Sequence, residues 1–234
     1  MLHRDRCSCS RRARRGMTYP ELSIGMAITA VLGLALSTFA VAVSTGWKHS
    51  EDEHQVRSAS MRSVSQIQDS LSEMLCAVQV KVGDAGGSSA YFFCWQKDTW
   101  GGSADRKAQL GEMALIEYEP ATKTVWLYQV KDAATMTSAE QTTASSENWG
   151  DYTDPAVVTY FKSRSMVAAR TPLVGGYGTT AEGGTQVLSA QFGAFAANNG
   201  KPIASYRLMI GNALSASAAS GNVALRAART PKNL

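Results

Sequence analysis

The sequence predicts an α+β protein in which one long N-terminal helix, half transmembrane and half amphipathic, packs on an antiparallel β-sheet head. Three observations predict this fold class. An uncharged run of 26 residues extends from Leu22 to Trp47. Apolar residues then recur at mostly three- and four-residue steps, which is the spacing of an amphipathic helix. This predicted stripe consists of Val56, Met61, Val64, Ile67, Leu71, Met74 or Leu75, and Val78. Beyond Gly87 the chain changes to short β-type segments separated by turn residues.

The uncharged run is long enough to cross a membrane. At about 1.5 Å per helical residue, the segment from Leu22 to Val43 spans about 33 Å, and a bilayer core is about 30 Å thick. The alternative is a secretory signal that is cleaved after Ala42 and releases a soluble protein. Signal peptides have apolar centres of only about 7–15 residues, so the run favours an anchor that stays in the membrane.

The charges on either side of the run predict its orientation. Residues 1–16 carry six arginines and one acid, whereas three acids at 51–53 follow Lys48. Because lysine and arginine are retained on the cytoplasmic side, we expect a cytoplasmic N-terminus and export of everything after about Trp47. The net charge of +4 comes from the first 16 residues, since the rest has 17 basic and 18 acidic residues. That balance predicts no nucleic-acid binding by the head.

Glu21 lies at the edge of the apolar run and requires an explanation. A carboxylate at this position costs a few kcal/mol unless it finds a partner or reaches the interface. One explanation places Glu21 among the lipid headgroups, at the positive end of the helix dipole. Pro20 supports a helix start here, because proline is tolerated in the first helical turn. This explanation does not account for the preceding Arg-Arg-Gly-Met at 14–17.

Together these residues resemble the start of type IV pilins and type II secretion pseudopilins. Members of that family have a short basic leader ending in glycine, a hydrophobic first mature residue, and glutamate at the fifth mature position. Gly16, Met17 and Glu21 match these three positions. The usual first mature residue is phenylalanine, with methionine an accepted variant, and Tyr19-Pro20 departs mildly from the common Leu-Ile or Leu-Pro pair.

The resemblance implies a processing step and a filament. A prepilin peptidase would cut between Gly16 and Met17 on the cytoplasmic side and N-methylate Met17. Glu21 would then attract the α-amine of a neighbouring subunit, which would offset the desolvation of both charges and penalise wrong registers. The implied partners are the peptidase, other pilin or pseudopilin subunits, an inner-membrane assembly platform and membrane lipid. The size of the exported part favours a minor subunit, which would be inserted in the bacterial inner membrane and then enter a periplasmic or surface filament.

We expect four parts: a leader at 1–16, a transmembrane and assembly helix at 17–47, its amphipathic continuation at 48–82, and a β-rich globular head at 83–234. The long helix should end near Val82, because Gly83-Asp84-Ala85-Gly86-Gly87 follows. In the head we predict a hairpin across Pro120, a surface loop at 132–148, a short helix that begins at Asp154-Pro155, and a glycine-rich loop at 175–184. The strand candidates are 89–96, 112–119, 123–130, 186–195, 203–210 and 222–228.

Two cysteines, Cys76 and Cys94, remain after the leader is removed. In an oxidising compartment they could pair and stabilise the head by about 3 kcal/mol through loop closure. The alternative is two buried free thiols.

The exported part of the chain offers no catalytic constellation. Its only histidines, His49 and His54, lie beside the predicted membrane helix. Together with the acids at 51–53 they could suggest a metal site, but adjacent residues of a helix point in different directions. A calcium site at 151–154 lacks the full ligand spacing, and Gly175-Gly-Tyr-Gly lacks the lysine of a phosphate-binding loop. The tryptophans are expected in the core. We therefore predict no enzymatic activity, no cofactor and no metal. The alternative function is a single-span, membrane-anchored periplasmic binding module that does not polymerise.

Overall fold

The structure is a computed structural model that describes residues 17–98, 105–145, 154–175, 185–196, 202–212 and 215–226. The chain divides into two compact units, Met1–Lys48 and His49–Leu234. One α-helix, α1 (Tyr19–Ser72), contributes to both units.

In the first unit, every described side chain is exposed. These side chains include a long series of large apolar groups, from Met17 and Leu22 to Phe39 and Trp47. Apolar side chains that point outward all around a helix are expected where the surrounding medium is lipid. Among the described residues, α1 is the one helix long and apolar enough to cross a membrane.

In the second unit, α1 buries one face against the head. Val56, Ile67 and Leu71 of the predicted stripe are buried, which confirms the predicted face at these positions. Met61, expected in the same stripe, is 73% exposed. Small residues complete the buried face: Ala59, Ser60 and Ser63.

The predicted helix end near Val82 is wrong. Helix α1 ends at Ser72, and the next six residues of regular structure form strand β1 (Cys76–Lys81). The backbone N–H of Leu75 already donates to the carbonyl of Trp95 at 2.8 Å, so sheet pairing replaces the helical hydrogen bonds. The β-branched Val78 suits a strand better than a helix, although its position also matches the helical period.

Five strands form an antiparallel sheet in the order β1-β2-β3-β4-β5. The predicted strand at 89–96 and the predicted hairpin are confirmed. Strand β5 was not predicted, because it is short and contains Pro172. The bounds are β2 (Ala90–Trp95), β3 (Met113–Glu119), β4 (Thr124–Gln129) and β5 (Thr171–Val174).

A second antiparallel sheet has the order β6-β7-β8, with β6 (Gln186–Ala196), β7 (Pro202–Gly211) and β8 (Ala216–Ala224). All three strands were predicted, but β8 begins earlier than residue 222, in an Ala/Ser-rich segment of low β-propensity.

Short helices occupy part of the segment that was expected to be a surface loop. The 3-10 helix η2 (Ala133–Thr135) and α2 (Ser138–Ala144) correct the loop prediction for 132–145. Thr137 and Glu140 form a reciprocal capping box at the start of α2, a signal visible in the sequence. Helix α3 (Ala156–Ser163) confirms the helix predicted after Asp154-Pro155, and η1 (Leu110–Glu112) precedes β3.

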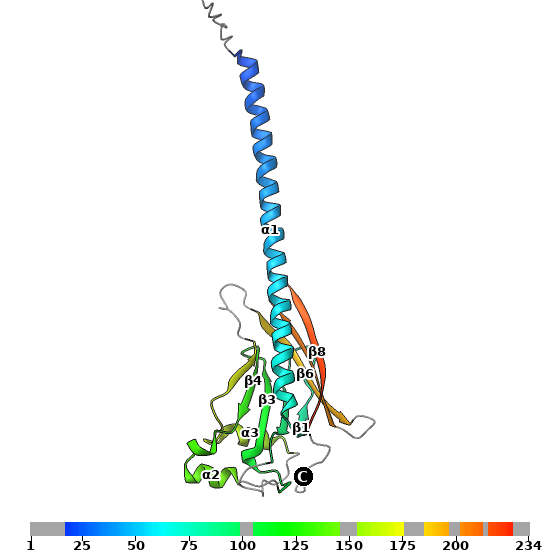
Figure 1. Cartoon of the computed structure of the whole chain (residues 1–234). Helices are drawn as coiled ribbons and strands as arrows, with labels where there is room; N and C mark the ends of the chain where they lie inside the picture. The colour runs from blue at the N-terminus through cyan, green and yellow to red at the C-terminus, as the bar shows by residue number, and fades with distance from the viewer. Residues whose placement is uncertain are drawn as a thin grey trace, which may run out of the picture. The chain divides into compact units, whose positions relative to one another are not determined.

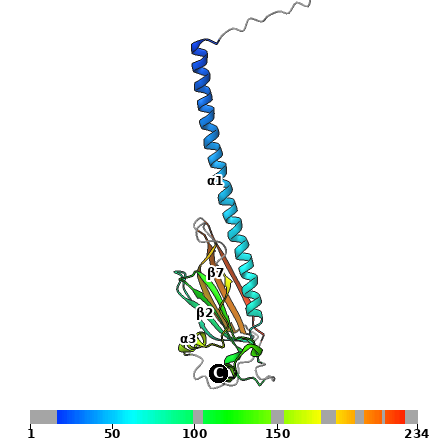
Figure 2. The same cartoon turned by 90° about the vertical axis from the view of Figure 1, so that its left-hand side faces the viewer.

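Two apolar clusters form the core of the head, one on each face of the five-stranded sheet. The first joins α1, one face of this sheet and the three-stranded sheet; it includes Ile67, Phe92 and Leu208. The second lies on the opposite face, where α2 and α3 cover it; it includes Phe93 and Phe161. Figures 1 and 2 show α3 near the end of the head where α1 finishes. The expected α+β class with antiparallel sheets is therefore confirmed.

Candidate functional site

The start of α1 holds the residues that the sequence singled out. The backbone N–H and the Oγ1 hydroxyl of Thr18 both donate to Oε2 of Glu21, each at 2.9 Å. The carbonyl of Thr18 accepts from the N–H of Leu22 at 3.1 Å. Thr18 and Glu21 thus occupy the ends of a Thr-x-x-Glu capping pattern, which closes the first turn of the helix. Thr18 was not predicted as a site residue, although its three-residue spacing from Glu21 is the signal for such a cap.

The two carboxylate oxygens of Glu21 are not equivalent. Thr18 occupies Oε2, and within the described part of the chain Oε1 accepts no hydrogen bond. Oε2 is therefore held in place, whereas Oε1 can accept a hydrogen bond from a group outside the helix. Met17 lies just before this turn and is 72% exposed. Gly16 lies outside the described residues, so the geometry of the Gly16–Met17 bond is not described.

A shallow groove of about 530 Å³ follows this turn along the helix. A Cβ added at Gly25 would meet nothing within 4 Å, so the helix surface is open there. The Thr29 hydroxyl donates to the Gly25 carbonyl at 2.7 Å and is therefore satisfied within the helix. The rest of the groove surface is mainly apolar. Its lining residues are Met17, Leu22, Gly25, Met26, Thr29 and Ala30.

Cys76 and Cys94, considered above as a possible disulfide, are not bonded in this structure. Both are free and buried. In the β1–β2 register Cys76 lies opposite Trp95, whereas Cys94 lies opposite Ala77. Neighbouring residues of a strand point to opposite faces, and the two thiols accordingly belong to different clusters of the core. The alternative of two buried free thiols describes this structure.

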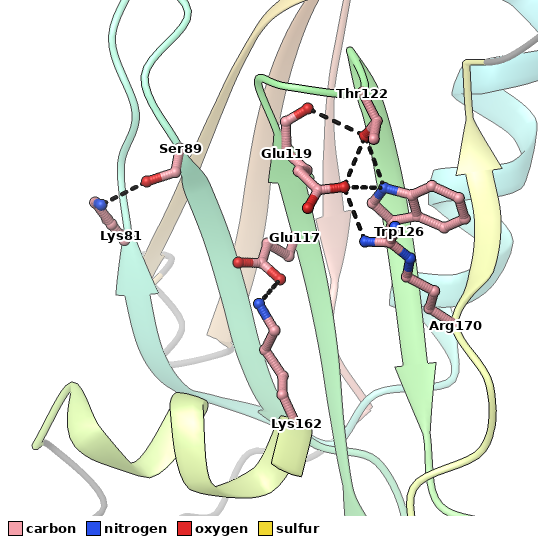
Figure 3. Close-up of polar contacts among 8 residues, drawn as sticks. All are labelled: Lys81, Ser89, Glu117, Glu119, Thr122, Trp126, Lys162 and Arg170. Atoms are coloured by element: carbon pink, nitrogen blue, oxygen red, sulfur yellow. Dashed lines mark hydrogen bonds and ion pairs between the residues drawn. The ribbon is translucent and has the colours of Figure 1, made fainter.

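On the face of the five-stranded sheet that α2 and α3 partly cover, two cations are each held by an acid and an aromatic ring (Figure 3). Lys162 of α3 contacts Glu117 Oε2 at 2.6 Å and lies 5.4 Å from the centre of the Tyr128 ring. The resulting contact ties the end of α3 to β3.

The second cation is Arg170, just before β5. Its Nη1 contacts Glu119 Oε2 at 2.8 Å, and its guanidinium lies 4.1 Å from the centre of the Trp126 ring. Glu119 also accepts from Thr122 Oγ1 at 2.8 Å and from Trp126 Nε1 at 3.1 Å, as Figure 3 shows. The Thr122 hydroxyl, followed by Arg170, lowers the pKa of the Glu119 carboxyl. We call these two arrangements the Lys162 clamp and the Arg170 clamp.

Both clamps have a structural explanation. The Lys162 clamp joins α3, and the Arg170 clamp joins the residue just before β5, to an acid on β3 and a ring on β4. Each clamp therefore positions its segment against these two strands. Beside them, Lys81 Nζ donates to Ser89 Oγ at 2.7 Å. The neighbouring Tyr91 has a raised pKa because of burial and the negative charge of Glu117.

Other candidate sites do not assemble in the described part of the chain. No group of three or more His, Cys, Asp or Glu side chains there could hold a metal ion; this includes His49, His54 and the acids at 51–53. Residues 151–153 of the calcium candidate and 176–184 of the glycine-rich loop lie outside the described residues, as do Trp100 and Trp149.

The structure also reveals a buried polar pair that the sequence did not suggest. Trp95 is buried as predicted, and its Nε1 donates to Glu112 Oε2 at 2.9 Å. Glu112 is 1% exposed and also accepts from the backbone N–H of Gln109 at 3.4 Å. These contacts explain why a carboxylate is tolerated in the core.

No family model, curated protein or solved structure matches this chain.

Proposed function

We propose that this chain is a minor pilin-like (pseudopilin) subunit of a type IV pilus or type II secretion filament. In this proposal a prepilin peptidase cuts between Gly16 and Met17, Met17 is N-methylated, and α1 then packs with the helices of other subunits. The observation that carries the proposal is the position of Glu21, which is the one acid at the start of a long apolar helix and directly follows an arginine-rich segment.

The geometry of the first turn supports a role for Glu21 in assembly. Cleavage after Gly16 would create a positive α-amine at Met17. A neighbouring subunit could receive that amine at Glu21 Oε1, because Thr18 occupies only Oε2. In an apolar bundle the pairing offsets the desolvation of both charges, and an unpaired charge disfavours wrong registers. The arginine-rich leader must be removed first, since six arginines cannot enter such a bundle without a large desolvation cost.

The same proposal assigns the location and the partners. The N-terminus lies in the cytoplasm, α1 crosses the bacterial inner membrane once, and the head is exported. The partners are the peptidase, other subunits, the assembly platform and membrane lipid. The head contributes no catalytic activity.

One observation favours a second candidate, the anchored periplasmic binding module that does not polymerise. Thr18 already gives Glu21 two hydrogen bonds within its own helix, and this cap gives the acid a role without any neighbour. The two candidates differ in whether residues 1–16 are removed and in whether Glu21 is needed outside its own chain.

Mass analysis of the native N-terminus separates the candidates. N-methylated Met17 supports the filament subunit, an intact Met1 supports the anchored module, and Val43 indicates a released soluble protein. In addition, Glu21→Ala should insert in the membrane but enter filaments at least about tenfold less, because leaving one charge of a buried pair unpaired costs about 3–5 kcal/mol. The control is Glu53→Ala, which removes an exposed acid that pairs with Arg57 on the same helix. Normal incorporation of Glu21→Ala would refute the proposed pairing.

A further inference from the structure

The two free thiols of the head lie on neighbouring strands but on opposite sides of one sheet. The thiol of Cys94 is in the cluster that contains α1, where it contacts Met74 Sδ at 3.1 Å and the Ala114 carbonyl at 3.3 Å. The thiol of Cys76 belongs to the cluster beneath α2 and α3. Cys94 is fully buried and Cys76 is 4% exposed.

This arrangement prevents a bond between them while β1 is paired with β2. A disulfide requires the two Cβ atoms to lie within about 4.5 Å and to point toward each other. Moving Cys76 to the face of Cys94 would need a one-residue slip of β1. Such a slip turns every side chain of the strand to the other face, so Val80 would leave the first cluster, where it packs opposite Phe92.

We propose that the native head and a Cys76–Cys94 disulfide exclude each other, so the head must fold with both thiols reduced, and the pairing of β1 with β2 then protects them. The disulfide form is a separate, non-native species in which β1 cannot take its place at the edge of the sheet. Export to an oxidising compartment, which rests on the proposed function, would make the order of folding and oxidation decisive.

The chemistry of the protection is that of thiol–disulfide exchange. A thiolate of the chain attacks a disulfide oxidant such as oxidised glutathione, one glutathione thiol leaves, and the second chain thiolate displaces the other. The chain loses two electrons and two protons, and the oxidant becomes two thiols. In the folded head, burial raises the pKa of Cys76 to about 11 and that of Cys94 still further. Few thiolates are therefore present, and no oxidant can reach Cys94.

The test uses the purified full chain with Cys7→Ser and Cys9→Ser, so that Cys76 and Cys94 are its only thiols, in detergent micelles at pH 8 with oxidised glutathione. We expect the thiols of the native chain to be lost at least about 100-fold more slowly than those of the chain in guanidinium, because of the small thiolate fraction and burial. The oxidised monomer, isolated after the guanidinium step and then diluted, should lack the near-UV circular dichroism and protease resistance of the native head. Dithiothreitol should restore both.

The matched control carries both Cys76→Ala and Cys94→Ala, since it passes through the same steps but can form neither the disulfide nor a glutathione adduct. It should regain the native signals with or without oxidant. If this variant does not fold, the recovery of the parent chain on reduction still decides the question. The proposal is overturned if the disulfide-linked monomer regains native spectra and protease resistance, if reduction fails to restore them, or if native and unfolded chains oxidise at similar rates. These measurements need no filament, so they can fail independently of the proposed function.

Discussion

Glu140 connects two segments of the head through a single carboxylate. Its Oε2 accepts from the backbone N–H of Thr137 at 2.8 Å, and its Oε1 pairs with Lys131 Nζ at 3.0 Å. The Thr137 backbone, followed by Lys131, lowers the pKa of Glu140 to about 2. The pKa of Glu140 is lower in the folded chain than in the unfolded chain. At pH values between these two pKa values, the unfolded chain therefore binds more protons than the folded chain.

The contribution of Glu140 to stability should therefore be complete above about pH 5 and decline as the pH falls toward 2. We expect Glu140→Gln to lower the urea midpoint at pH 6 and to have a steadily smaller effect between pH 5 and pH 2. The measurement is urea unfolding of both chains across this range. Glu73→Gln is the control, because Glu73 is an exposed acid after the end of α1. A difference between wild type and Glu140→Gln that does not change with pH would contradict the assignment.

At this scale the sequence predicted positions better than it predicted partners. Glu21 stood out because it is an acid beside an apolar run, yet its hydrogen bonds with Thr18 depend on the local turn. The cysteines were recognised as a pair, but the sequence could not tell which face of the sheet each would occupy. That depends on the β1–β2 register, which includes an irregularity between Ala77 and Gln79.

Among the strands, β8 contains a glycine whose place a larger residue cannot take. Gly221 lies opposite Tyr206 of β7. A Cβ at Gly221 would lie 2.6 Å from the Tyr206 hydroxyl oxygen and 2.9 Å from its ring carbon Cζ. Tyr206 is 3% exposed and packs in the cluster that contains α1. Its ring therefore has little room to move away.

Gly221→Ala should destabilise the head by about 1–3 kcal/mol, the usual effect of adding atoms to a packed core. Urea unfolding followed by near-UV circular dichroism measures this change. Ser220→Ala is the control on the same strand; Ser220 is exposed, and its replacement should change stability by less than about 0.5 kcal/mol. Equal stability of the two variants would mean that the Tyr206 ring is free to shift.

Strands with strong β-propensity were predicted well, whereas segments that fit two patterns were not. The aromatic run of β2 and the hairpin of β3 and β4 have local signals. In contrast, Val78 fits the helical period of α1 as well as a strand, and the pairing of β1 with β2, across the turn that follows β1, decides between them. The start of β8 has small residues without strand preference, so its pairing with β7 determines its conformation.

For the whole molecule, composition and the long apolar run were enough to predict one N-terminal helix and an antiparallel head. They could not predict that the five-stranded sheet has apolar side chains on both faces, because alternation alone does not show which segment covers the second face. The covering segments α2 and α3 are short, and the residues of α2 resemble a polar loop. The Lys162 clamp depends on this same covering, and the Arg170 clamp depends on the pairing of β5 with β4, so neither could be predicted.

The division into two units predicts which part of the chain the head needs. No described side chain before residue 49 is buried, and the buried face of α1 begins with Val56. A chain starting at His49 should therefore be a soluble monomer whose thermal midpoint lies within about 4 °C of that of the full chain in detergent, which corresponds to less than 1 kcal/mol. A chain starting at Arg62 also loses Val56 and Ala59 and should be less stable by about 2–4 kcal/mol, because apolar burial is lost and a cavity is left. Size-exclusion chromatography and thermal circular dichroism check both. If the chain from His49 aggregates or melts as early as the shorter one, the apolar half of α1 is required for the fold of the head as well as for anchoring it.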